Sequence, residues 1–173
     1  MKGMNVIKGQ DLGVVQFAVD ADTTTALYKK DPCMLEDDGK AATMTVAASK
    51  NYIGPALTIY DENKVELSYL PLSTAGYVDV ATNSELLLSL EADGAVTETD
   101  RGNLSDLTTS ATGSTNTGNS GQTISASTST DCAQFMILDK INTPGNDWGD
   151  TNIQLLVKAA EHLFATKTAP AGV

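Results

Sequence analysis

Aromatic residues, cysteine and histidine are scarce in this chain. Phe, Trp and Tyr make up 5% of its 173 residues, and there are two cysteines and one histidine. So few thiols and imidazoles argue against the disulfide framework of a small secreted domain and against a paired Cys/His zinc site. A Ser-His-Asp or Cys-His arrangement would have to use His162. His162 lies near the end of the chain, and we expect it to be an exposed or interface residue.

The cysteines give no clear signal for chemistry. Cys33 and Cys132 are expected to be small buried residues, although a disulfide between them stays open. Lys29 and Lys30 near Cys33 would lower the pKa of its thiol, but no second catalytic group accompanies it. The acidic turn 36–40 lacks the ligand spacing of a calcium loop. We therefore predict no enzyme activity, no catalytic residue, no cofactor and no metal site.

Long hydrophobic runs and excess positive charge are also missing. No run approaches the 18 apolar residues of a membrane helix, and the N-terminus has no apolar region of the kind found in signal peptides. The formal net charge of −11 disfavours direct contact with nucleic acid, whose phosphates would be repelled. A spread of acidic residues is typical of a solvated surface, and a partner with basic patches suits it better.

The residues that are present predict an all-β fold. Residues 52–81 contain short apolar or alternating runs separated by Asp/Asn and Ser/Thr/Gly turns, which is typical of an antiparallel sheet. The segments 12–19, 41–47 and 85–90 predict further strands, and Asp38-Gly39 predicts a hairpin turn. Residues 133–141 are apolar on both faces, which predicts a central strand covered on both sides. An antiparallel β-barrel or β-sandwich is expected.

The end of the chain allows two interpretations. Apolar residues in 153–164 recur at helical spacing, which predicts a short C-terminal helix, whereas 153–157 could also pair as a closing strand. The simplest organisation is one β-domain, residues 12–165, preceded by an N-terminal arm, residues 1–11, and followed by a tail, residues 166–173.

Residues 108–131 form the most unusual segment. Nineteen of these 24 residues are Ser, Thr, Gly or Asn, and only Ile124 could anchor a core. Because too few residues follow for a second domain, we interpret the segment as a long surface excursion of one domain. It is expected to take extended structure when it packs on a partner.

Several motifs along the chain form a recognisable order. Between residues 50 and 165 they are Ile53-Gly54-Pro55-Ala56, Leu70–Tyr77, the acidic strand Leu86–Asp93, Thr117–Gly121, Phe135–Leu138, Pro144–Asp150, and Leu156-Val157 with His162 downstream. In this order the chain resembles the capsid decoration (cement) proteins of tailed bacteriophages. It departs from that family at Ala159-Ala160, where the family tends to keep a polar strand.

The resemblance implies an all-β domain, commonly a homotrimer, that covers junctions between major capsid subunits. It implies a virion protein on the capsid exterior, made in the host cytoplasm, whose partner is the major capsid protein. Neither nucleic acid nor membrane is expected as a partner. The residues expected to contact the partner are Met4, Val6 and Ile7 in the arm, Thr117 and Asn119 in the loop, and Trp148 in the turn.

Two other kinds of function stay open. The chain could be another structural part of a virion, such as a fibre, tail or shell subunit, which would differ from a decoration protein in copy number. It could also be a glycan-binding β-domain, in which case binding should depend on Trp148.

Overall fold

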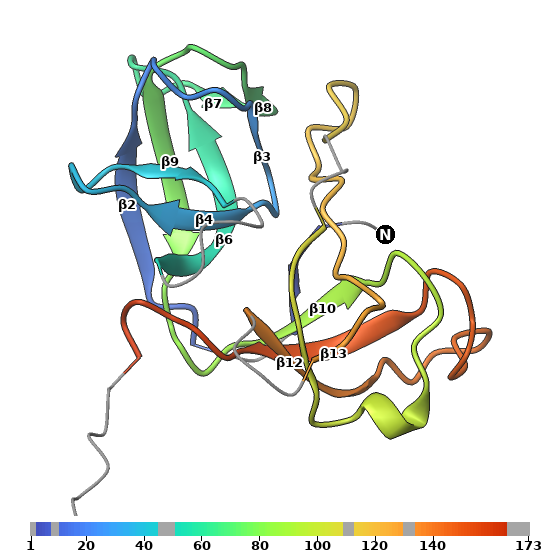
Figure 1. Cartoon of the computed structure of the whole chain (residues 1–173). Helices are drawn as coiled ribbons and strands as arrows, with labels where there is room; N and C mark the ends of the chain where they lie inside the picture. The colour runs from blue at the N-terminus through green and yellow to red at the C-terminus, as the bar shows by residue number, and fades with distance from the viewer. Residues whose placement is uncertain (1–2, 8–10, 45–50, 109–112, 130–133, 166–173) are drawn as a thin grey trace, which may run out of the picture.

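The fold is all-β and antiparallel, as predicted (Figure 1). The computed structural model describes residues 3–7, 11–44, 51–108, 113–129 and 134–165. Every pairing between its named strands is antiparallel. The sheets are consistent with a β-sandwich, and within the described residues neither sheet closes into a barrel.

The first large sheet is built from one contiguous stretch of sequence. Its strands run in the order β2-β9-β6-β4-β5, and β7 also pairs with β6. Their bounds are β2 Val14–Val19, β4 Pro32–Leu35, β5 Ala41–Thr43, β6 Tyr52–Tyr60, β7 Glu66–Leu67 and β9 Gly76–Ala81. The short strands β3, Leu27–Tyr28, and β8, Tyr69–Leu70, pair with each other. The apolar segment 65–72, part of the predicted stretch 52–81, is thus divided between β7 and β8.

The second sheet combines the two ends of the chain. Its order is β1-β10-β13-β12-β11, so the C-terminal strand β13 lies in the middle. The bounds are β1 Asn5–Val6, β10 Leu87–Glu91, β11 Leu104–Ser105, β12 Phe135–Lys140 and β13 Gln154–Ala159. A 3-10 turn, η1 Glu98–Asp100, precedes β11.

Of the two interpretations of the end of the chain, the structure bears out the closing strand, and one other prediction about this sheet is wrong. The helical spacing in 153–164 does not produce a helix, because β13 pairs along its whole length with β10 and β12. Leu155 and Val157 alternate into the core, and this period of two overrides the helical spacing. The expectation that β12 is covered on both sides also fails, since Met136 faces outward and is exposed.

Two hydrophobic clusters form the interior. One lies behind the sheet of β1, β10, β12 and β13, and the other lies within the sheet of β2, β4, β6 and β9. Tyr52, at the start of β6, belongs to the first cluster, while its neighbour Ile53 belongs to the second. The Tyr52 ring meets Phe135 edge to face at 5.3 Å between centroids. The first residues of β6 therefore join the two clusters.

The middle of β6 is shaped by Gly54 and Pro55. Gly54-Pro55 inside an apolar run is typical of a bulge or an edge strand; the pairing of β6 is irregular on both sides of this point, and β6 is a central strand. Gly54 has φ +137°, and a Cβ atom there would overlap the carbonyl group of Ala81 on β9. Glycine at this position allows the two backbones to approach closely.

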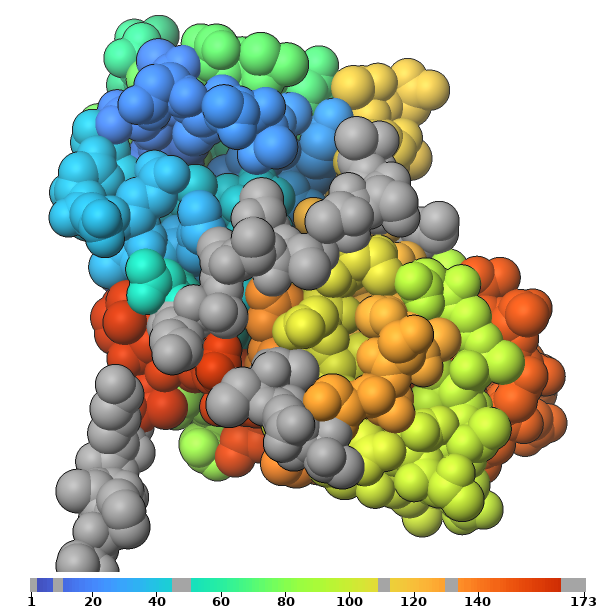
Figure 2. Space-filling view, viewed as in Figure 1, coloured from blue at the N-terminus to red at the C-terminus, as the bar shows by residue number. Residues whose placement is uncertain are grey.

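The Ser/Thr/Gly-rich segment packs on its own chain over the described residues 113–129. It makes bridges with Lys29, Ala92, Leu104 and Leu107, and Ile124 is fully buried, as its apolar side chain suggested. Figure 2 shows this segment lying against both halves of the molecule. Residues 109–112 and 130–133, and the predicted tail 166–173, lie outside the described residues.

Candidate partner-binding surface

The N-terminal residues 3–7 do not form a separate arm. Asn5 and Val6 make up β1 and pair with β10, and the N–H of Met4 donates to the carbonyl oxygen of Lys30 at 2.9 Å. Met4 is only 1% exposed and sits in the first hydrophobic cluster, so most of its side chain is covered by its own chain. Val6 and Ile7 are half-buried.

A surface hollow nevertheless brings three of the predicted contact residues together. It has a volume of about 240 Å³ and is lined by Met4, Asn5, Val6, Lys29, Lys30, Ala56, Leu57 and Asn119. Residues from four segments that are distant in the sequence therefore converge on one place. Sequence reasoning missed Leu57 and the role of the two lysines, because no local pattern links them to β1.

Asn119 reaches this hollow because the loop before it turns sharply. Gly118 has φ +68°, and a Cβ atom there would overlap the backbone of Ser68. The carbonyl oxygen of Gly118 accepts from the N–H of Lys29 at 2.9 Å, which fixes the loop beside β3. Asn119 is half-buried, whereas Thr117 is exposed at the loop surface and does not line the hollow.

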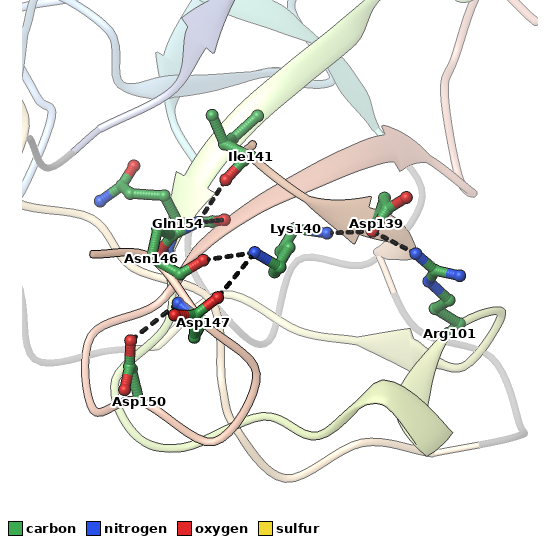
Figure 3. A network of polar contacts seen from close by, with 8 residues as sticks. All are labelled: Arg101, Asp139, Lys140, Ile141, Asn146, Asp147, Asp150 and Gln154. Carbon is green, nitrogen blue, oxygen red and sulfur yellow. Dashed lines mark hydrogen bonds and ion pairs between the residues drawn. The ribbon is translucent and has the colours of Figure 1, made fainter. Parts of the chain in front are cut away.

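Trp148 lies in the turn between β12 and β13 and is not among the residues that line the hollow. It is half-buried against the first cluster, and the Arg101 guanidinium lies 5.5 Å from the centre of its ring. Figure 3 shows how polar contacts hold this turn: Lys140 donates to the carbonyl oxygen of Asn146 at 2.7 Å and pairs with Asp147 at 3.1 Å. The turn presents a fixed surface.

Asn146 is the centre of that turn. Its side-chain amide donates to the carbonyl oxygens of Ile141 and Gln154 at 2.7 and 2.9 Å, and its Oδ1 accepts from the N–H of Gln154 at 2.7 Å. Asn146 is 7% exposed, so these bonds are shielded from water. One side chain thus ties both ends of the turn together.

Replacing Asn146 with alanine should lower the free energy of unfolding by about 2–4 kcal/mol, because buried backbone groups lose their partners. Asn142→Ala, at an exposed position in the same turn, is the control and should change it by less than about 0.5 kcal/mol. Urea denaturation of both variants measures the difference. Equal stabilities would show that the Asn146 bonds are not needed to hold the turn.

A buried carboxyl group lies next to the hollow. Asp31 follows Lys30 and is 2% exposed, and its Oδ2 accepts from the N–H of Tyr28 at 2.8 Å. Burial raises the pKa of Asp31 to about 6, although hydrogen bonds from Ser120, the Tyr28 backbone and Thr43 act in the opposite direction. Asp31 thereby connects the Ser/Thr/Gly-rich loop to the β3–β4 turn.

The raised pKa of Asp31 predicts a pH-dependent stability. The folded state favours the protonated carboxyl of Asp31. The stabilisation that Asp31 contributes to the folded state is therefore full below about pH 3.9 and is lost as the pH rises through about 6. In this window the folded state binds more protons than the unfolded state, so the free energy of unfolding falls as pH increases. The change should be on the order of 2–3 kcal/mol.

Asp31→Asn removes this titration and isolates its effect. The stability of wild type relative to Asp31→Asn should therefore decrease between pH 4 and pH 7.5, whatever the constant offset between the two proteins. Urea denaturation across this range measures both curves, and the other carboxyl groups cancel in the difference. Parallel curves would contradict a raised pKa at Asp31.

Cys33 and His162, the two residues considered for catalysis, are both buried. Burial raises the pKa of the Cys33 thiol well above its ordinary value, which is opposite to the lowering expected from nearby lysines. Cys132 lies outside the described residues. His162 is buried and not exposed as predicted, with its ring edge to face against Tyr52, and burial lowers the pKa of its imidazole. Both side chains are packed as core residues.

An apolar surface on β2 was not anticipated. β2 lies at the edge of its sheet, and Val14 and Val15 are 52% and 45% exposed. The sequence did predict the strand, but a run that is apolar on both faces is typical of a strand covered on both sides, so it carried no signal that Val14 and Val15 would be exposed. The exposed apolar side chains make β2 a second candidate contact surface.

Within the described ranges, no helix is long and apolar enough to span a membrane. The same residues contain no group of three or more His, Cys, Asp or Glu side chains placed to hold a metal ion. Comparison with models of known protein families, with curated proteins and with solved structures found no match to this chain.

Proposed function

We propose that this chain is a structural virion protein that binds over junctions between major capsid subunits and stabilises the shell of a tailed bacteriophage. The observation that carries the proposal is the exposed apolar edge strand β2, with Val14 and Val15 open to solvent. An exposed, apolar strand edge is prone to pair with another chain, and in a decoration protein a neighbouring subunit would cover it.

The motifs behind the resemblance support the proposal through the positions they occupy. Gly54 lies where β6 and β9 approach closely, Gly118 lies in the turn beside Ser68, and Asn146 holds the β12–β13 turn. The Gly118 and Asn146 motifs therefore determine how two surface loops are presented, and the Gly54 motif determines how two strands of one sheet pack. A decoration protein needs contact surface of fixed shape, and many symmetry-related copies reinforce one another through avidity.

Binding to expanded empty shells of the same virus tests the proposal. The purified chain should co-sediment with such shells at a copy number near that of the shell subunit, and it should raise the temperature at which the shells disrupt. Absence of co-sedimentation would overturn the proposal. A copy number of about a dozen or fewer would favour a tail or fibre component instead.

The contribution of β2 is tested with matched valine variants. Val14→Lys places a charge on the apolar edge and should weaken shell binding by about tenfold or more. Val65→Lys introduces the same charge at a valine that is 58% exposed in the turn between β6 and β7, and it should leave binding unchanged. Equal binding by both variants would show that β2 is not the contact.

A further inference from the structure

The hollow beside β1 has the size of a site for one side chain. Its volume is about 240 Å³, which is below the range of roughly 300–1,000 Å³ that is usual for pockets that bury a drug-sized ligand. Val6, Ala56 and Leu57 contribute apolar surface to its lining. A small organic ligand would fill it poorly, whereas a single aliphatic side chain fits the available space.

Backbone hydrogen bonds fix the walls of the hollow. The N–H of Lys30 donates to the carbonyl oxygen of Ala56 at 2.8 Å, and the N–H of Ser120 donates to that of Lys29 at 2.8 Å. Lys30 adopts φ +70°, a conformation that costs free energy for a residue other than glycine and that occurs often at binding sites. The site is thus formed before any partner arrives, which reduces the entropy cost of binding.

The hollow also lies at the edge of a sheet. Because β1 is an edge strand of its sheet, it has a neighbouring strand, β10, on one side only. The N–H of Ile7 donates to the carbonyl oxygen of Leu87 at 3.1 Å. The antiparallel alternation therefore directs the N–H and C=O of Val6 away from β10, to the side where Met4 meets Lys30. An extended segment placed there can bond to the backbone of Val6.

The charge of the lining differs from that of the chain. Two of the eight lining residues are lysines and none is acidic, although the formal net charge of the chain is −11. Lys29 pairs with Glu66 at 2.6 Å, and both side chains of this ion pair are partly exposed, so an incoming carboxylate can compete for it. The lining thus offers two lysine side chains and no carboxylate, in a chain whose formal net charge is negative.

We propose that this hollow binds an extended acidic segment of a partner protein. The segment pairs with the backbone of Val6, places one aliphatic side chain against Ala56 and Leu57, and directs its flanking carboxylates toward Lys29 and Lys30. Backbone pairing at a strand edge combined with a pocket for one side chain is a recurring mode of peptide recognition. The identification of that partner as a shell subunit rests on the proposed function, whereas the chemistry of the hollow does not.

Short peptides of defined charge test this inference without a capsid. The probes are acetyl-Asp-Glu-Leu-Asp-Glu-amide and acetyl-Lys-Lys-Leu-Lys-Lys-amide, titrated into the isotope-labelled chain and followed by NMR of the backbone amides. In 0.15 M salt, where the screening length is about 8 Å, the acidic peptide should bind with Kd on the order of 1 mM. Its chemical-shift changes should centre on Val6, Leu57 and Asn119.

Variants then locate the site. Asn119→Trp fills the hollow and should abolish binding of the acidic peptide, whereas Thr115→Trp, at an exposed position in the same loop, should preserve it. Lys30→Glu should weaken binding about tenfold or more. Lys158→Glu is its control with the same net charge, placed on β13 where Lys158 pairs with Glu85, and it should leave binding unchanged. Spectra of residues distant from each substitution confirm that each variant is folded.

Several outcomes would overturn the inference. These are the absence of shift changes at millimolar acidic peptide, equal binding of the basic peptide, and undiminished binding to Asn119→Trp or Lys30→Glu. Concentration-dependent shifts of Val6 and Leu57 without peptide would show that a second copy of the chain occupies the hollow instead. Failure of the chain to bind shells, together with normal peptide binding, would refute the proposed function alone.

Discussion

Gly54→Ala is expected to lower the free energy of unfolding by about 3 kcal/mol or more. Gly54 has φ +137°, and an added Cβ atom would overlap the Ala81 carbonyl oxygen and lie 2.8 Å from the Ala81 carbonyl carbon. Both obstacles are backbone atoms of the neighbouring strand, so no side-chain rotation can relieve them. The β6–β9 pairing would have to separate at the place where the two hydrophobic clusters meet.

Gly39→Ala is the matched control for this substitution. Gly39 also has a positive φ, +83°, but apart from Gly39 and its two chain neighbours no residue has an atom within 4 Å of the position that a Cβ would take. Gly39→Ala should lower the free energy of unfolding by only about 1–2 kcal/mol, which is the cost of the backbone strain alone. Urea denaturation monitored by circular dichroism compares the two variants. Similar losses for both would mean that β6 and β9 do not approach as closely as the structure shows.

Tyr52→Ala should have a comparable effect for a different reason. Tyr52 is fully buried, its ring packs edge to face against Phe135 and His162, and its hydroxyl lies 3.3 Å from the Met4 sulfur. Removing the ring leaves a cavity at the junction of the two clusters. The expected loss in the free energy of unfolding is about 3–5 kcal/mol.

Tyr52→Phe separates the packing of the ring from its hydroxyl. It keeps the aromatic contacts and loses only the weak contact with Met4, so it should cost about 1 kcal/mol or less. Differential scanning calorimetry of the three proteins measures both effects. A large loss in Tyr52→Phe would mean that the hydroxyl, and not the ring, holds the junction together.

The sequence predicted those elements that are defined by a pattern of residues next to one another in the chain. The β2 strand and the turn at Gly39 follow directly from apolar runs and from residues that accept a positive φ. The segment 153–164 was more difficult, because its apolar residues satisfy both a helical and an alternating pattern. Pairing with β10 and β12, which are distant in the sequence, decides in favour of the strand.

The candidate site was predictable only in part. Val6 and Asn119 were singled out because each belongs to a segment that looked available for contact, and they do line the same hollow. Their proximity depends on backbone bonds between segments far apart in the chain, such as that from Met4 to Lys30. The burial of Met4 has the same origin, since the apolar character of a residue does not indicate whether it faces a core or a partner.

The position of β13 between β10 and β12 affects the order in which the chain can fold during synthesis. The sheet of β2, β4, β5, β6, β7 and β9 needs only residues 14–81, so it can form while translation continues. The other sheet lacks its middle strand until residues 154–159 have left the ribosome, and until then neither β10 nor β12 has that neighbour. Only after β13 has emerged can β10 and β12 be joined into one sheet.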